Sequence, residues 1–160
     1  MSEKQYNPNY KIYKPNLKDS SKGAATSWEY NTTTRNFFLT IAQQNKEKDA
    51  GGNPTFGWKE HSEMLKLDVE ELAEIVLVTT KAKPSLGNLD DSNGKGKGFY
   101  HQTKDGNTIL KIYQLETGFG LEISSKKEGV QFWSGQRISP SEAEVIKLMC
   151  EHAATRMIFG

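Results

Sequence analysis

NFFLTIAQQ (residues 36–44) decides the fold of this chain, because it aligns without a gap on NTILKIYQL (residues 107–115) at an offset of 71 residues. The same offset places Lys66 on Arg137, further along each segment. An internal repeat indicates one structural unit used twice, with each copy burying its apolar face against the other. The repeated unit therefore predicts the fold, and its exposed face is where we expect the function.

The composition limits the classes of protein to which the chain can belong. Its 160 residues suffice for one domain with a substantial core, and 35% of them are apolar and 26% charged. Lys and Arg total 21 against 20 Asp and Glu, which gives a net charge of +1. A globally basic nucleic-acid-binding protein is excluded, so any basic surface is expected to be local.

The sequence predicts a protein of a reducing compartment. Cys150 is the single cysteine, so no internal disulfide can form. Its place in a helical apolar stripe favours a core residue over a nucleophile. No apolar run is long enough to span a bilayer, and residues 1–22 lack the apolar segment of a secretion signal. We therefore expect a cytoplasmic protein that is neither secreted nor bound to a membrane.

Periodicity and turn signals predict four strands followed by a helix in the first copy. We expect strands over residues 24–30, 35–44, 55–61 and 64–67, and a loop over 45–54. Asp68 with Glu71 three residues later forms the capping-box pattern that begins a helix. Residues 1–23 are polar and predict an N-terminal arm, mostly irregular or extended.

The second copy repeats this order. We expect strands over residues 99–102, 107–116, 119–124 and 130–134. Ser139-Pro140 then begins a long amphipathic helix that reaches the C-terminus. The prediction is an α+β fold: two antiparallel four-stranded β-sheets with helices and an internal ββββα duplication. Residues 24–160 would form a single domain from copies 24–84 and 99–160, joined by a flexible loop over residues 85–98.

The strands carry the candidate binding residues, because alternate side chains of a strand point to opposite sides of a sheet. In residues 107–115, Leu110 and Ile112 are expected to meet the helices, while Lys111 and Tyr113 lie on the other face. Aromatic rings beside cations suit single-stranded nucleic acid, since bases stack on the rings and the cations contact phosphates. On these grounds the candidate nucleic-acid-binding residues are Trp28, Arg35, Phe38, Trp58, Lys59, Lys66, Lys95, Lys97, Tyr100, Lys111, Tyr113, Trp133 and Arg137.

Each candidate also has an ordinary structural interpretation. Aromatic residues usually fill cores, and Phe38 in particular would then pack against the opposite sheet. Lys66 and Arg137 occupy equivalent places in the two copies and are either paired phosphate contacts or solvated surface charges. Lys95 and Lys97 lie between glycines, in either a plain linker or a mobile basic clamp.

No pattern in the sequence indicates catalysis. The three histidines lie about forty or more residues apart, without the spacing of metal ligands. A Gly-x-Ser-x-Gly nucleophile elbow is absent, and the glycine-rich stretch 94–98 lacks the ending of a phosphate-binding loop. We therefore expect no catalytic residues, no metal and no cofactor.

Several short motifs, in order, resemble the Whirly family of single-stranded DNA-binding proteins. They are KGAA (22–25), FGWK (56–59), MLKLDV (64–69), FYH (99–101), GLEIS (120–124) and MIFG (157–160). The similarity covers about residues 20–160. One copy alone resembles the small transcriptional coactivators that dimerise on single-stranded DNA. Plant Whirly proteins carry a transit peptide and this chain does not, so a phage or bacterial member is expected.

The resemblance implies a sequence-tolerant single-stranded DNA-binding protein that acts in DNA replication, recombination or repair. It also implies a homodimer or homotetramer assembled through helices, with replication or transcription proteins as further partners. Two alternatives stay open. One is an RNA-binding or RNA-annealing module, and the other is a transcription regulator that acts through protein contacts.

Overall fold

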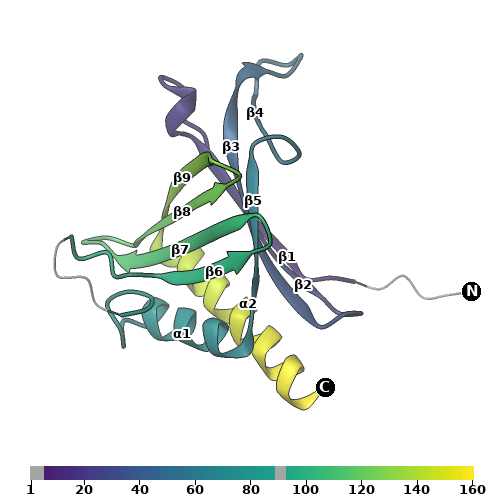
Figure 1. Ribbon diagram of the computed structural model, residues 1–160, viewed down its shortest axis with the longest axis vertical. Helices are drawn as coiled ribbons and strands as arrows, with labels where there is room; N and C mark the ends of the chain where they lie inside the picture. The colour runs from purple at the N-terminus through teal and green to yellow at the C-terminus, as the bar shows by residue number, and fades with distance from the viewer. Residues whose placement is uncertain (1–5, 89–92) are drawn as a thin grey trace, which may run out of the picture.

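The computed structural model describes residues 6–88 and 93–160, which form two antiparallel sheets and two helices (Figure 1). The first sheet contains β1 (Asn9–Lys14), β2 (Ala24–Asn31), β3 (Asn36–Lys48), β4 (Pro54–Phe56) and β5 (Ser62–Leu67). The second contains β6 (Phe99–Thr103), β7 (Gly106–Gln114), β8 (Phe119–Lys127) and β9 (Val130–Ile138). The helices are α1 (Val69–Thr79) and α2 (Pro140–Phe159), and a short 3-10 turn, η1 (Ser20–Lys22), precedes β2.

The ββββα duplication is confirmed. The order β1-β2-β3-β5 followed by α1 matches the order β6-β7-β8-β9 followed by α2. The short strand β4 is an addition to the first sheet, because it pairs with the distal part of β3, beyond the part that pairs with β5. In Figure 1 this β3–β4 hairpin projects away from the end of the molecule where the two helices lie.

The offset of 71 residues holds for the second half of each copy only. It correctly matches Lys66 of β5 with Arg137 of β9, and it matches the helix caps Asp68 and Ser139. Upstream it matches β3 with β7, although the structural counterpart of β3 is β8. The β3–β4 hairpin causes this shift, since the first copy contains it and the second does not. The hairpin also extends β3 to Lys48, inside the expected loop, and shortens the strand expected over residues 55–61 to β4.

Parts of the expected arm and linker belong to the sheets. Residues 9–14 form β1, which pairs along its length with β2 and buries Ile12, so the first copy begins at Asn9 and not at Ala24. In the expected linker, Leu86 is fully buried and its backbone N–H donates to the carbonyl of Ile112 at 3.0 Å. Residues 1–5 of the arm and 89–92 of the linker lie outside the described residues.

Both helices begin with the predicted capping box. The Asp68 carboxylate accepts from the backbone N–H of Glu71 at 2.8 Å, and the Glu71 carboxylate accepts from that of Asp68 at 3.1 Å. Ser139 and Glu142 repeat the arrangement at α2. Each box satisfies backbone donors that a helix start leaves without an intrahelical partner, which is why both boundaries follow from local sequence.

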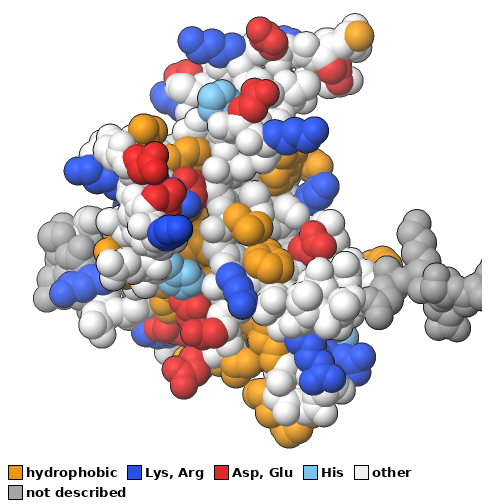
Figure 2. Space-filling model, turned by 45° about the vertical axis from the view of Figure 1, so that its right-hand side comes forward, with side chains coloured by type: hydrophobic (Ala, Val, Ile, Leu, Met, Phe, Trp, Pro, Cys, Tyr) orange, Lys and Arg blue, Asp and Glu red, His pale blue; other side chains and the backbone are white. Residues whose placement is uncertain are grey.

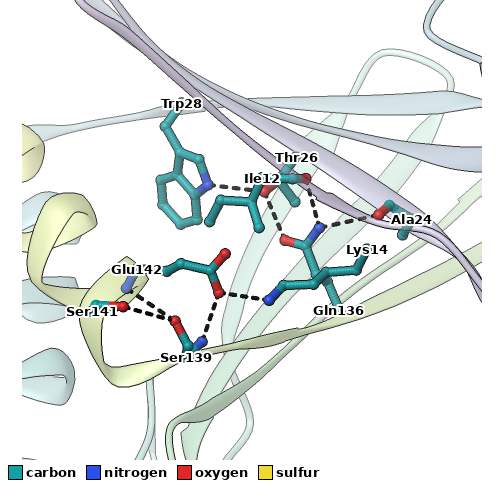
Figure 3. Close-up of polar contacts among 9 residues, drawn as sticks. All are labelled: Ile12, Lys14, Ala24, Thr26, Trp28, Gln136, Ser139, Ser141 and Glu142. Atoms are coloured by element: carbon teal, nitrogen blue, oxygen red, sulfur yellow. Dashed lines mark hydrogen bonds and ion pairs between the residues drawn. The ribbon is translucent and has the colours of Figure 1, made fainter.

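One hydrophobic core is shared by both sheets and both helices. A buried glutamine, Gln136 of β9, connects the sheets within it (Figure 3). Its amide nitrogen donates to the carbonyls of Ile12 at 2.9 Å and Ala24 at 3.2 Å, and its oxygen accepts from the Thr26 hydroxyl at 2.8 Å. Because Gln136 points inward, its neighbours Gly135 and Arg137 lie on the outer side of β9.

Candidate nucleic-acid interface

The outer face of the sheet β6–β9, opposite the core, brings together most of the predicted residues of the second copy. We call it the platform face. Cross-strand pairing defines three of its rows: Tyr113, Gly120 and Arg137; Lys111, Glu122 and Gly135; and Tyr100, Ile109, Ser124 and Trp133. The inward neighbours Leu110 and Ile112 are buried, as strand alternation predicts.

Two aromatic rings on the platform face lie against glycine backbone. A Cβ atom on Gly120 would lie 2.4 Å from Cε2 and Cζ of Tyr113, so the ring occupies the space that a side chain would fill. The Trp133 ring lies similarly against Gly135, whose Cβ would come within 2.9 Å of it. Trp133 is 53% exposed, and its backbone carbonyl accepts from the Gln43 amide of β3 at 2.7 Å. The two glycines therefore allow large rings to rest flat on the sheet instead of standing away from it.

Glu122 lies between the two rings and binds both. Its carboxylate accepts from the Tyr113 hydroxyl at 2.5 Å and from Nε1 of Trp133 at 3.1 Å. Lys95 lies 2.8 Å from the same carboxylate, and its Nζ is 5.4 Å from the centre of the Tyr113 ring. Partial burial alone would raise the pKa of Glu122, but the hydrogen bonds from Lys95, Tyr113 and Trp133 outweigh it and lower that pKa. Burial, reinforced by the Glu122 carboxylate, raises the pKa of Tyr113, so the tyrosine hydroxyl keeps its proton.

A groove of about 490 Å³ runs along this part of the platform face. Its described lining includes four cations, Lys14, Lys22, Lys95 and Arg137, and the carboxylate of Glu122, while Lys14 is also paired with Glu142 at 2.8 Å. The chain as a whole has almost no net charge, and Figure 2 shows acidic and basic side chains interspersed over the surface that it draws. The groove therefore supplies the local basic surface that the composition required, beside two aromatic rings.

The first sheet has a separate aromatic cluster on its outer face. The ring of Tyr13, on β1, lies 5.5 Å from that of Phe56 and 6.5 Å from that of Trp58, edge to face with the latter. Nζ of Lys11 lies 5.6 Å from the centre of the Trp58 ring. Trp58 is half-buried, whereas its neighbour Lys59 is exposed. The cluster contains one of the predicted aromatics in contact with a lysine that was not predicted.

Three further candidates meet in a hollow of about 570 Å³ between β5 and β6. Arg35, Lys66 and Tyr100 line it, together with His101, and Tyr100 is 60% exposed. Arg35 is in the turn before β3 with a positive φ of 57°, and Lys66 pairs with Phe38 across the sheet. Two cations and an exposed ring in one hollow are compatible with a nucleotide, although the hollow is distinct from the groove.

One candidate residue is wrong, and two others lie away from the groove. Trp28 is fully buried in the core, where its Nε1 donates to the Thr26 hydroxyl at 3.1 Å, so it cannot contact nucleic acid. Trp28 lies on the inner face of β2 with Thr26 and Tyr30, while Ser27 and Glu29 between them are partly exposed. Phe38 is half-buried on the outer face of the first sheet. Lys97 is exposed and lies outside the residues that line the groove.

The sequence prediction missed the residues that organise the platform face. Glu122 was absent from it, as were Gly120 and Gly135, and so were Lys14 and Lys22 of the groove. A signal for the glycines existed, since a glycine inside a strand often marks a close approach of another group to the backbone. Gly-x-Glu on β8 and Trp-x-Gly on β9 are such signals.

Comparison with solved structures identifies the fold. The chain matches Trypanosoma brucei MRP1/MRP2 with a TM-score of 0.70 and 12% identity, over 97% of this chain and 88% of that one. It matches a guide-RNA-binding protein complex bound to a guide RNA with a TM-score of 0.69 and 12% identity, over 97% of this chain and 94% of that one. It matches WHY3 from Arabidopsis thaliana with a TM-score of 0.65 and 15% identity, over 99% of this chain and 92% of that one. No protein-family model and no curated protein matches the sequence.

These similarities define the class of structure: the chain has the Whirly-like α+β fold, two antiparallel sheets each followed by a helix. The sequence resemblance to Whirly proteins is thereby confirmed at the level of the fold. At 12–15% identity the neighbours share the arrangement of elements with this chain but few side chains, so Tyr113, Trp133 and Glu122 have to be assessed on this chain's own geometry.

Proposed function

We propose that the chain binds single-stranded nucleic acid on the platform face, with little sequence preference and without catalysis. The observation that carries the proposal is the groove in which Tyr113 and Trp133 rest on glycine backbone beside four cations. Bases would stack on the rings, and the cations would neutralise phosphates. Stacking tolerates any sequence because every base has a π-face.

The preferred ligand is single-stranded DNA, with RNA as the alternative. The resemblance to Whirly proteins favours DNA, and the similar guide-RNA-binding complex bound to a guide RNA favours RNA. A titration with matched DNA and RNA oligomers decides between them, because only RNA offers a 2′-hydroxyl.

The proposed function involves no catalytic step. Within residues 6–88 and 93–160, no group of three or more His, Cys, Asp or Glu side chains could hold a metal ion. Cys150 is fully buried, and burial raises the pKa of its thiol, which makes it a poor nucleophile. In the same ranges, no helix combines the length and apolarity needed to cross a bilayer.

We further propose that the chain assembles into a homodimer or homotetramer through α2. Its inner side packs on the core through Ala143, Ile146, Cys150 and Ala153. Yet Leu148 is 60% exposed, Ile158 58% and Phe159 81%. Hydrophobic side chains are visible at the lower end of the molecule in Figure 2, where the C-terminal helix ends in Figure 1. Apolar surface of this kind on a helix is typical of a contact with another chain.

The cellular role proposed is DNA replication, recombination or repair in a reducing, cytoplasmic compartment. A transcription regulator that acts through protein contacts is the competing role. Recovery of polymerase subunits from nuclease-treated extract would favour the regulator, because contacts mediated by nucleic acid are then removed.

Fluorescence anisotropy with a labelled poly-dT oligomer tests the function, with the same strand in duplex form as competitor. We expect the single strand to bind more tightly, because stacking needs unpaired bases and the weak net charge holds a duplex poorly. Trp133→Ala should weaken binding about 5- to 150-fold. Since Trp133 is 53% exposed, its removal should leave the melting temperature nearly unchanged. Tyr6→Ala, which removes an exposed aromatic ring outside the groove, is the matched control, and equal affinity for duplex and single strand would refute the proposal.

A further inference from the structure

The carboxylate of Glu122 is the common partner of every group that the proposed site would use for stacking. It accepts hydrogen bonds from Tyr113 at 2.5 Å and from Trp133 at 3.1 Å, through different oxygens. The Lys95 ammonium lies 2.8 Å from the oxygen that Tyr113 binds. The Glu122 side chain is only 15% exposed, so these three groups, and not water, provide most of its partners.

A negative charge is unexpected at the centre of a surface that binds phosphates. Its presence has a geometric consequence, since one carboxylate fixes the polar ends of two rings that come from different strands, β7 and β9. Both rings are thereby held in one orientation before any ligand arrives, which lowers the entropy lost on binding.

The position of Lys95 has a second consequence. Its Nζ lies over the Tyr113 ring, 5.4 Å from the centre, and the ring also lies against Gly120, whose Cβ atom would be 2.4 Å from it. An ammonium and a base cannot occupy the same ring face together. Stacking on Tyr113 therefore requires Lys95 to leave Glu122, which rotation of the flexible lysine side chain allows.

We propose that Glu122 is a positioning residue with two effects on binding: it orients the rings of Tyr113 and Trp133 for stacking, and it holds Lys95 over Tyr113 until a phosphate replaces the carboxylate as the partner of that lysine. This inference rests on the proposed function. It assigns the free protein a self-occupied site, in which an internal carboxylate takes the place of the nucleic-acid phosphate.

Two substitutions at Glu122 separate these effects. Glu122→Gln keeps one acceptor oxygen for Nε1 of Trp133, and its NH2 group can donate to the Tyr113 hydroxyl, so both rings keep a partner. It removes the charge that retains Lys95, so it should bind poly-dT about 2- to 5-fold more tightly than the wild type. Glu122→Ala removes the ring acceptor as well, so it should bind more weakly than Glu122→Gln. Glu128→Gln, in the exposed turn between β8 and β9, is the matched control for the change in net charge.

Lys95→Ala provides a test that leaves Glu122 intact. It should bind more weakly at low salt, because one phosphate contact is lost, and the slope of log K against log salt should become shallower by about 0.7. In the Lys95→Ala background, Glu122→Gln should give no further gain, since the lysine that it releases is absent. Melting temperatures within a few degrees of the wild type establish that all variants are folded.

The outcomes are distinct. A gain in Glu122→Gln that depends on Lys95 supports the inference. Wild-type or weaker binding by folded Glu122→Gln overturns it, as does a gain that persists without Lys95 or that Glu128→Gln reproduces. If the wild type binds poly-dT and Trp133→Ala does not, the proposed function is supported, whichever result the Glu122 variants give. If the wild type binds no single-stranded nucleic acid at all, both the proposed function and the inference are wrong.

Discussion

Gly120→Ala should impair nucleic-acid binding although it removes no binding group. The added Cβ would lie 2.4 Å from two ring carbons of Tyr113, and an ordinary contact is 3.4 Å or more. The Tyr113 ring must therefore move by about 1 Å, which displaces its hydroxyl from the 2.5 Å bond to Glu122 and weakens or breaks that bond. The backbone itself accepts alanine, because Gly120 is not among the residues with positive φ.

The stability and affinity effects of this change should separate. Loss of the tyrosine hydrogen bond costs about 0.5–1.5 kcal/mol, and the reduced entropy of the unfolded chain offsets about 0.4–1 kcal/mol of it. The free energy of unfolding should therefore change by less than about 1 kcal/mol. The stacking energy on Tyr113, about 1–3 kcal/mol, should be largely lost, which corresponds to a 5- to 150-fold weaker affinity.

Anisotropy titration with poly-dT, beside thermal melting, measures both quantities. The control is Ser124→Ala, an outward position on the same strand that makes no contact with Tyr113 in the pairing of β8. The double variant with Tyr113→Ala should bind like Tyr113→Ala alone, because the glycine acts only through the ring. Wild-type affinity in a folded Gly120→Ala protein, or additive losses in the double variant, would show that Tyr113 is not a stacking platform.

Three further predictions concern stability and assembly. Gln136→Leu leaves two buried carbonyls without their donor, so it should lower the free energy of unfolding by about 3 kcal/mol and Tm by about 6–12 °C. Gln131→Leu, on the exposed side of β9, is the control and should leave Tm unchanged. Equal melting curves for the wild type and Gln136→Leu would show that the Gln136 hydrogen bonds do not stabilise the fold. For Glu142, partial burial would raise the pKa, but the Lys14 ion pair and the bonds from Ser139 outweigh it and lower the pKa. The stability that Glu142 contributes is therefore fully present above its ordinary pKa of 4.5 and is lost as pH falls through the lower folded value, so acid denaturation followed by circular dichroism should be less steep in Glu142→Gln. Light scattering at micromolar concentration should show a dimer or larger assembly that Leu148→Glu dissociates, and a wild-type monomer would exclude assembly through α2.

Local patterns in the sequence predicted the features that depend on local chemistry. Both helix starts were found, because a capping box involves residues only three positions apart. The outward placement of Lys111 and Tyr113 followed from strand alternation, which depends on no distant contact. These two kinds of signal account for the two helices and for half of the platform face.

Features that depend on distant segments were missed for a physical reason. Ile12 is the only large aliphatic residue of β1, and that strand is held by backbone pairing to β2, which leaves little trace in composition. Alternation places Trp28 and Tyr30 on one face of β2, but that this face is the inner one depends on α2 and on β9 of the second sheet, which pack against the strand. Glu122 gains its role from residues of two other strands, and a lone glutamate in a strand gives no sign of such partners.

The extra β3–β4 hairpin makes the two copies unequal, and this inequality has a directional consequence. A polynucleotide has a 5′ end and a 3′ end, and a surface built from two identical halves related by a two-fold axis would accept it equally well in either orientation. In this chain one half carries Tyr13 and Trp58 under a lysine, whereas the other carries Tyr113 and Trp133 around a glutamate. The two halves of the chain are therefore not equivalent, and a strand bound across both at the proposed site would run in one preferred direction.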